Sequence, residues 1–125
     1  MPEIIHTDDA PDAVGAYSQA TVTDDLVFTA GQIALTPDGE LLDDADVATQ
    51  TEQALDNLTA VLEAADSSLD DVLKVTVFLA DIADFEAMNE TYATYFESAP
   101  PARSAIQAGA LPAGAAVEIE AVAER

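Results

Sequence analysis

The sequence predicts an α+β fold in which two helices cover one face of a β-sheet. Two segments, one after residue 46 and one after residue 84, carry apolar residues every three or four positions, which is typical of amphipathic helices. Short apolar, β-branched segments lie before, between and after them, which is typical of strands. The 125-residue chain shows no internal repeat and no linker, so we expect one domain spanning residues 1–125.

The first part of the chain is predicted to form three short strands. Glu3–His6 could form the first, and an irregular stretch follows it. Residues 20–22 and 26–29 are predicted as two strands joined by a tight turn. Gly31 follows directly, at a point where the backbone can bend or approach a ligand closely. Pro37-Asp38-Gly39 predicts a further turn.

The middle of the chain is predicted to form a long helix and a strand. Acidic residues before position 47 favour a helix start there. One apolar face of about five turns follows, formed by Val47, Thr51, Ala54, Leu55, Leu58, Val61, Leu62 and Ala65. After a break over residues 67–71, residues 72–79 are predicted as a strand. Its alternation puts Leu73, Val75, Val77 and Leu79 on one face.

A second helix is predicted to begin at about Asp84. Its single stripe consists of Phe85, Met88, Asn89, Tyr92, Tyr95 and Phe96. Asn89 is the exception in this stripe, either as a satisfied polar core residue or as one that meets a ligand or the neighbouring backbone. Pro100 and Pro101 end the helix. Residues 102–108 and 116–123 are then predicted as two strands joined by a short turn, so Arg103 and Glu118 could be hairpin neighbours.

The composition excludes several classes of function. With no cysteine, thiolate catalysis, disulfides and Cys-ligated metals are absent. No apolar run approaches the ~18 residues of a membrane span, and the N-terminus has no signal-peptide pattern. The net charge of −22 disfavours nucleic-acid binding. Because the 25 acidic residues are spread along the chain and only one lysine is present, we interpret the charge as adaptation to high salt, in the cytoplasm of a salt-accumulating microbe.

Arg103 is one of only three basic residues, and it lies in an apolar segment. It is either a structural ion-pair partner or a receptor for a small anion, because a guanidinium can bind a carboxylate with two donors. Glu118 and Glu120 share one strand face by alternation. They are either simply solvated, or one of them is a general acid/base near Arg103.

Three other features are weighed in the same way. His6 has no partner histidine or cysteine, so we expect no metal site. Ser18 and Ser104 have no visible base that would make either of them a nucleophile. Tyr17 stands in a loop, where an aromatic side chain is either a pocket wall or a packing residue.

Six segments taken together resemble one family, the reactive intermediate deaminases (RidA, also called YjgF). They match in order and with matching spacing over nearly the whole chain. The segments are Gly15–Ala20, Phe28–Ile33, Val72–Leu79, Met88–Tyr92, Pro101–Ser104 and Glu118–Ala121.

The resemblance implies a chorismate-mutase-like fold with a mixed sheet, assembled as a homotrimer with ligand clefts between subunits. Members of the deaminating branch hydrolyse 2-enamine and 2-imine acids, such as 2-aminoacrylate, to 2-keto acids and ammonia. Pyridoxal-phosphate enzymes release these intermediates, but the family itself needs no cofactor. The expected partners of this chain are therefore such small molecules and other copies of itself.

The resemblance also implies a role for individual residues. Arg103 would hold the substrate carboxylate, and Glu118 would position or activate the attacking water. The other predicted site residues are Tyr17, which would close the pocket, Gly31 and the backbone of Ala105, which would line it, and Asn89, which would brace it. Ala30 and Ala105 stand where the family often has polar residues, which affects the expected substrate range more than the reaction. The alternative function is a non-catalytic binder of small keto or amino acids.

Overall fold

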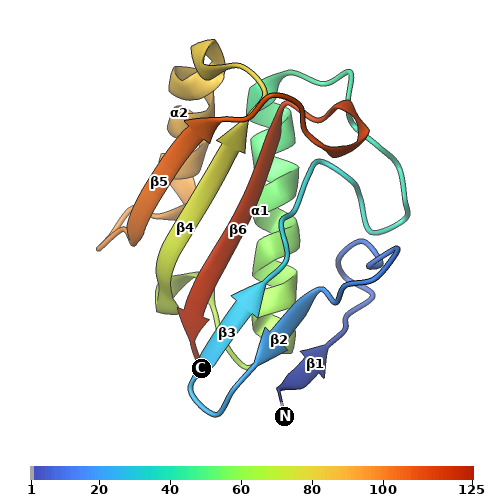
Figure 1. Cartoon of the computed structure of the whole chain (residues 1–125). Coiled ribbons are helices and arrows are strands. Elements are labelled where there is room, and N and C mark those ends of the chain that lie inside the picture. Colours follow the sequence, from blue (N-terminus) through green and yellow to red (C-terminus); the bar gives the residue numbers. More distant parts are fainter. Residues whose placement is uncertain (1) are drawn as a thin grey trace.

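The computed structural model describes residues 2–125. Within them, strands and helices follow the predicted order β-β-β-α-β-α-β-β, with short 3-10 helices at residues 69–71, 82–84 and 112–114 (Figure 1). The strands are β1 (Glu3–Ile5), β2 (Ala20–Val22), β3 (Leu26–Thr29), β4 (Val72–Leu79), β5 (Ala102–Gln107) and β6 (Val117–Glu124), and the helices are α1 (Val47–Ala64) and α2 (Phe85–Tyr95).

The six strands form one mixed sheet in the order β1-β2-β3-β6-β4-β5. β4 and β5 are parallel, and all other neighbouring pairs are antiparallel. The parallel pair follows from the connection between its strands, because α2 returns the chain to the end of the sheet where β4 began. The predicted hairpin of the last two strands is therefore wrong. β4 lies between β5 and β6, so Arg103 and Glu118 stand on strands that do not pair.

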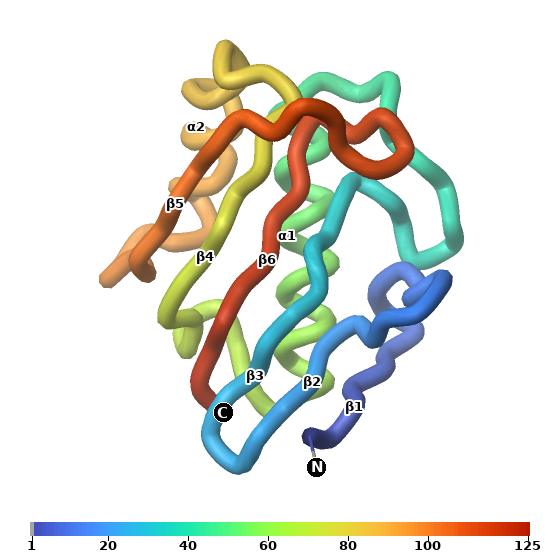
Figure 2. The backbone as a smooth tube through the Cα atoms, viewed as in Figure 1, coloured from blue at the N-terminus to red at the C-terminus, as the bar shows by residue number. Residues whose placement is uncertain are grey.

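α1 runs along the direction of the strands on one face of the sheet and packs against β6 and β3 (Figure 2). It begins after Asp46, whose side chain accepts a hydrogen bond from the Thr49 backbone N–H at 2.8 Å. This bond lowers the pKa of the Asp46 carboxyl. The predicted apolar face points inward, and its most deeply buried apolar members are Ala54, Leu55, Leu58, Val61 and Leu62. α1 and α2 lie side by side on the same face of the sheet, as predicted (Figure 1).

The register of β4 corrects one detail of the predicted strand. Its pairing with β6 shifts by one residue between Val72 and Lys74. This bulge moves Leu73 out of the alternation, and its side chain is 45% exposed although Val72 and Val75 are buried. From Val75 onward the strand alternates as expected. A bulge of this kind cannot be read from the alternation of apolar residues.

The sheet face opposite the helices, called the open face below, is uncovered in the single chain and partly apolar. Its apolar side chains include Phe28 and Ile106, which are 44% and 49% exposed. Phe78 and Val122 lie between them and are partly buried. Lys74 also lies on this face and donates a hydrogen bond to Ser104 Oγ at 3.0 Å.

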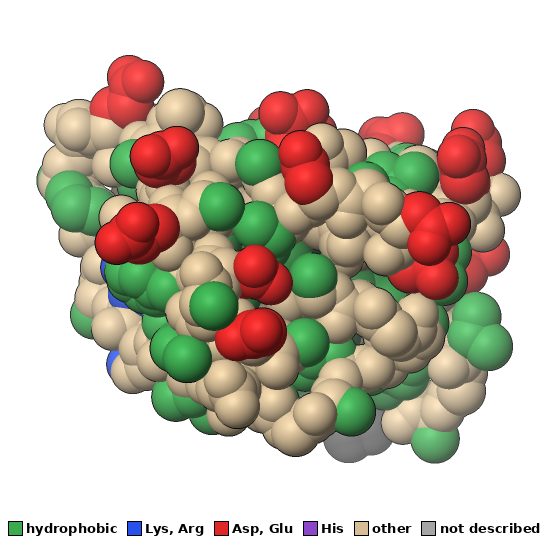
Figure 3. Space-filling model, turned by 90° about the horizontal axis from the view of Figure 1, so that it is seen from above, with side chains coloured by type: hydrophobic (Ala, Val, Ile, Leu, Met, Phe, Trp, Pro, Cys, Tyr) green, Lys and Arg blue, Asp and Glu red, His purple; other side chains and the backbone are tan. Residues whose placement is uncertain are grey.

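The surface is strongly acidic. Seen from the end of the molecule that Figure 1 draws at the top, Asp and Glu side chains are scattered over the surface, with few basic groups in view (Figure 3). Within residues 2–125 the ion pairs are His6–Asp8 and Glu3–Arg125. Most acids therefore have no basic partner. Neither helix in this part of the chain combines the length and the hydrophobicity that crossing a bilayer requires.

Candidate functional site

Glu118 lies near the start of β6, on the open face. Its neighbours in the strand, Val117 and Ile119, point into the core and are fully buried. Burial raises the pKa of the Glu118 carboxyl, and the nearby charge of Glu120 raises it further. A raised pKa brings a carboxyl group closer to the range in which it can both donate and accept a proton.

Gly31 lies directly beside this carboxylate. After β3 the chain continues along β6, where Gln32 and Ile119 exchange two backbone hydrogen bonds of 2.8 and 2.9 Å. A Cβ atom at Gly31 would lie only 2.5 Å from Glu118 Oε2 and 2.9 Å from Glu118 Cγ. Only glycine leaves room for the Glu118 side chain in this position.

Glu118 and Gly31 line an open pocket of about 490 Å³, called the Glu118 pocket below. Tyr17 lines the same pocket and is 55% exposed. Most of the remaining wall is apolar or uncharged, and it consists of Pro11, Asp12, Val14, Gln19, Ala30, Gln32, Ile33, Leu35 and Pro112. A few polar groups within a largely apolar wall are typical of small-molecule sites.

Arg103 lies on β5, which is an edge strand of the sheet, and it points toward α2. Its Nη1 donates a hydrogen bond to Asn89 Oδ1 at 2.7 Å. The guanidinium carbon lies 4.6 Å from the centre of the Tyr92 ring and 5.4 Å from that of Phe85. These distances are typical of cation–π contacts. Three residues of α2 thus fix the position of the guanidinium.

The structural ion-pair alternative for Arg103 finds no support in the part of the chain that the structure describes. Neither of the ion pairs in residues 2–125 involves Arg103. Its one side-chain partner there, Asn89, is neutral and occupies one of the five guanidinium N–H donors. The remaining donors can bind an anion.

Arg103 and Asn89 line a second, smaller pocket of about 360 Å³, called the Arg103 pocket below. Its other lining residues are Tyr92, Ala93, Phe96, Pro100 and Pro101. Tyr92 is 4% exposed, and its hydroxyl has no hydrogen-bond partner within residues 2–125. Burial raises the pKa of Tyr92, while the charge of Arg103 opposes this rise.

The structure therefore places the predicted site residues in two groups. Tyr17, Gly31 and Glu118 line one pocket, and Arg103 and Asn89 line the other. Within one chain the groups are separate, because Glu118 faces the open side of the sheet and Arg103 faces α2. Ala105 belongs to the Arg103 side, where it pairs with Val77 and is partly buried.

Sequence reasoning missed several residues around Arg103 and Glu118. Tyr92 and Phe85 were recognised in the helical stripe, but only as apolar positions. Their spacing to Asn89 is the signal that could have linked them to Arg103, because residues three or four apart share one side of a helix. The walls formed by Pro11, Val14 and Leu35 come from loops, and no periodic pattern marks them.

His6, Asp8 and Asp12 form a surface group whose potential ligand atoms lie within 4.8 Å of one another. All three side chains are exposed. His6 Nε2 and Asp8 Oδ1 are 3.1 Å apart, so a hydrogen bond accounts for the approach of this pair. Exposed acidic groups of this kind are common in a chain with 25 acids, and they do not indicate a metal centre by themselves.

The chain is similar to proteins of one family over almost its whole length. The family described as endoribonuclease L-PSP matches residues 7–125. A RutC family protein of Pyrococcus horikoshii is 47% identical over 123 residues, which cover 98% of both chains. The 2-iminobutanoate/2-iminopropanoate deaminase of Rattus norvegicus is also 47% identical, over 97% of this chain and 88% of the relative. The crystal structure of E. coli TdcF with bound serine has a TM-score of 0.93 and 41% identity, and the match covers 98% of both chains.

Proposed function

Because the chain belongs to the RidA/YjgF family, whose family description is endoribonuclease L-PSP, we propose that it hydrolyses 2-enamine and 2-imine acids to 2-keto acids and ammonia. Residues 1–125 would act as one domain without a cofactor, in the cytoplasm. Relatives at 46–47% identity carry the name 2-iminobutanoate/2-iminopropanoate deaminase, which supports small imines such as 2-iminopropanoate as substrates.

The observation that carries this proposal is the Glu118 carboxyl, whose pKa is raised. It lies against Gly31 in a largely apolar pocket. Hydrolysis of an imine requires water to add at C2 and a proton to reach the departing nitrogen. The ionised Glu118 would take a proton from the attacking water as the new C–O bond forms. The protonated carboxyl would give that proton to the imine nitrogen, which yields a carbinolamine. Glu118 would then take the proton of the new hydroxyl group and pass it to the nitrogen, so that the C=O bond forms as the C–N bond breaks and ammonia and the keto acid leave.

Arg103 would hold the substrate carboxylate through its free N–H groups. The Asn89 hydrogen bond and the Tyr92 ring keep the guanidinium in a fixed orientation before the substrate arrives. A preorganised binding group of this kind contributes to catalysis by placing C2 next to the base. An enamine substrate would first gain a proton at C3 and lose one from its nitrogen to become the imine.

The complete site would lie between subunits of a homotrimer. Two observations support this part of the proposal. Arg103 and Glu118 lie in different pockets of one chain, so one substrate cannot reach both there. The open face also exposes Phe28 and Ile106, which a second copy would cover. Sedimentation equilibrium in molar salt should give three chains per particle, and a stable, active monomer would contradict this proposal.

Although the family description names an endoribonuclease, our proposal does not include RNA cleavage. A protein with a net charge of −22 repels the phosphate backbone. Its single histidine also leaves no histidine pair for general acid and base roles. Non-catalytic binding of keto or amino acids remains the alternative, since it would use Arg103 but make no demand on Glu118.

The decisive experiment is deamination of 2-aminoacrylate, generated in the cuvette from serine by a pyridoxal-phosphate dehydratase and measured against spontaneous hydrolysis. Wild type should accelerate ammonia release, and Glu118→Gln should reduce turnover by roughly two to four decades. Arg103→Lys should weaken the binding of keto acids and lower catalytic efficiency, because lysine lacks the two-pronged contact. A wild-type protein that binds 2-oxobutanoate without accelerating hydrolysis would instead be a binder.

A further inference from the structure

We propose that Gln19 is a positioning residue that holds the loop over residues 7–17 in place as one wall of the Glu118 pocket. This inference rests on the proposed function, since it concerns the same site. Four residues of the loop, Pro11, Asp12, Val14 and Tyr17, line the pocket together with Gly31 and Glu118. Few contacts other than those of Gln19 attach this loop to the rest of the described chain.

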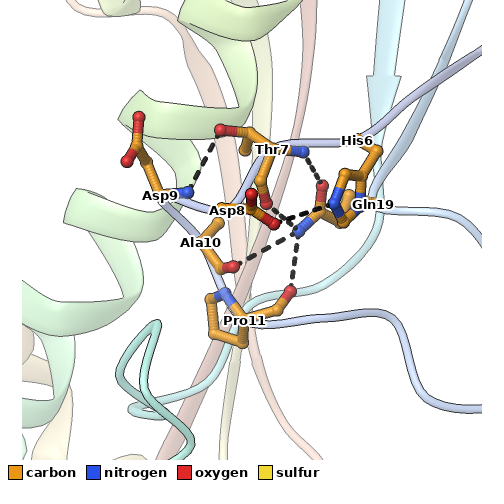
Figure 4. A network of polar contacts seen from close by, with 7 residues as sticks. All are labelled: His6, Thr7, Asp8, Asp9, Ala10, Pro11 and Gln19. Atoms are coloured by element: carbon orange, nitrogen blue, oxygen red, sulfur yellow. Dashed lines mark hydrogen bonds and ion pairs between the residues drawn. The ribbon is translucent and has the colours of Figure 1, made fainter.

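The Gln19 side chain binds the loop through both ends of its amide (Figure 4). Its Oε1 accepts a hydrogen bond from the Thr7 backbone N–H at 2.7 Å. Its Nε2 donates to the backbone carbonyls of Thr7 at 3.0 Å and Pro11 at 2.8 Å, with a longer contact of 3.4 Å to Ala10. The side chain is 2% exposed, so these bonds are shielded from water.

No other hydrogen bonds between residues 7–17 and the chain beyond residue 17 occur in the described part of the protein. The remaining polar contacts of the loop are local, such as that from the Asp9 backbone N–H to Thr7 Oγ1 (Figure 4). Ala10 adds a buried apolar anchor. Removing the Gln19 amide would therefore release most of the polar attachment of this wall.

Gln19 also connects this wall to the segment that carries Gly31. Its backbone carbonyl accepts a hydrogen bond from the Ala30 N–H at 2.8 Å. Ala30 directly precedes Gly31, which lies against the Glu118 carboxylate. Gln19 thus fixes the loop over residues 7–17 relative to the Glu118 carboxyl. Its side chain binds the loop, and its backbone binds Ala30 next to Gly31.

Gln19→Leu tests this proposal, with Gln50→Leu as its matched control. Gln50 is an equally buried glutamine that accepts one hydrogen bond, from the Ala116 N–H, and donates to the carbonyls of Asp43 and Ala45. None of these residues lines the Glu118 pocket. Gln19→Leu removes four buried polar contacts and Gln50→Leu removes three, but only the substitution at position 19 frees the loop over residues 7–17.

We expect Gln19→Leu to raise amide hydrogen exchange in a peptide covering residues 7–17 by at least about tenfold, because local opening governs exchange. The KM of deamination and the Kd of 2-oxobutanoate should rise about tenfold, because only the fraction of molecules with an ordered wall binds well. The kcat at saturation should change by less than about threefold. Gln50→Leu should lower the melting temperature but leave both constants within about twofold.

The proposal would be overturned if Gln19→Leu left loop exchange or 2-oxobutanoate affinity unchanged, or if Gln50→Leu weakened affinity equally. If either leucine variant fails to fold, Gln19→Met and Gln50→Met provide a second pair, since methionine keeps the unbranched, flexible shape of glutamine, removes the amide and adds no charge. Wild type that lacks deaminase activity would refute the proposed function alone, because loop exchange and 2-oxobutanoate affinity do not depend on turnover.

Discussion

Gly31 and Glu118 are in contact at a distance that no other residue type permits at position 31. The Glu118 carboxylate occupies the space where a Cβ would stand, 2.5 Å from Oε2. The backbone bonds between Gln32 and Ile119 keep the two strands at this separation. The position of the carboxylate is therefore set by backbone pairing together with the absence of a side chain.

Gly31→Ala should fold but lose activity. The new methyl group would displace Glu118 from its rotamer, at a cost of about 0.5–1.5 kcal/mol in stability. Displacement of the catalytic carboxyl should lower kcat by at least about tenfold. Gly109→Ala is the control, because a Cβ there meets nothing within 4 Å. Melting temperature and kcat measured on both variants decide the matter, and a fully active Gly31→Ala enzyme would show that the contact is unimportant.

Glu118→Gln should be more stable than wild type at neutral pH. The pKa of Glu118 is raised in the folded chain, so its contribution to stability is fully present below its ordinary value of about 4.3 and is lost as pH rises through the folded-state pKa. The stability gain of the variant should therefore grow with pH and vanish in acid.

Glu40→Gln removes one charge at an exposed position, and it controls for the change in net charge. Urea unfolding from pH 4 to pH 8 measures both variants. An equal gain for both, or a gain at Glu118 that is independent of pH, would contradict the burial argument.

The Tyr92 ring, and not its hydroxyl, should support Arg103. Tyr92→Phe keeps the ring under the guanidinium and removes a buried hydroxyl that has no hydrogen-bond partner within residues 2–125, so its affinity for 2-oxobutanoate should stay within about twofold. Tyr92→Leu removes a cation–π contact worth about 0.5–2 kcal/mol, which corresponds to roughly 2- to 30-fold weaker binding. Titration calorimetry compares them. Equal losses in both variants would assign the effect to the hydroxyl.

Two inactive variants should restore activity when they share a trimer. If each cleft takes Arg103 from one chain and Glu118 from its neighbour, a cleft between an Arg103→Leu chain and a Glu118→Gln chain can hold both intact residues. In a random equal mixture, half of the clefts receive an intact Arg103 and, independently, half receive an intact Glu118. About one quarter of the clefts should therefore be active. Co-refolded mixtures measure this fraction, and separately refolded samples combined afterwards serve as the control. A mixture that stays inactive would place both residues of each cleft on one chain.

Salt should stabilise the protein. Repulsion among the acids weakens as the screening length falls from ~10 Å at 0.1 M to ~3 Å at 1 M, and few of the acids have a basic partner. The melting temperature should rise by about 5 °C or more between dilute buffer and molar potassium chloride. Near pH 4, where about half of the carboxylates are neutral, the rise should be smaller. A flat response at neutral pH would remove the argument.

The sequence predicted the elements of the fold well because their signals are local. The strand over residues 72–79 and the helix after Asp46 have the bounds that alternation and capping indicated. Leu73 was misplaced because a bulge depends on the partner strand, which the local pattern does not contain. The pairing of the last two strands was also misjudged. A strand, a helix and a strand in succession over residues 72–107 are typical of a parallel crossover, whereas the short turn before β6 suggested a hairpin of β5 and β6 instead.

The site was predictable only as a set of residue types. Arg103 stood out as a rare basic residue and Glu118 as an acid on a strand face, and the resemblance of the chain to a family implied their roles. The sequence could not show that they face opposite sides of one sheet, because β5 has no fully buried apolar alternation that would mark which of its faces meets the helices. Gln19 escaped notice because a polar residue at a strand start is ordinary, and its importance comes from burial that only the folded loop creates.

Lys74 makes it possible to follow dissociation of the expected oligomer by chemical labelling. It is the only lysine in the chain, and its ammonium donates to Ser104 on the open face. An amine-directed acylating reagent therefore has a single side-chain target, and that target lies on the surface that we expect a second copy to cover. Acylation of Lys74 should be slow in the assembled protein and fast after dissociation, so the labelling rate reports directly on the lifetime of the oligomer.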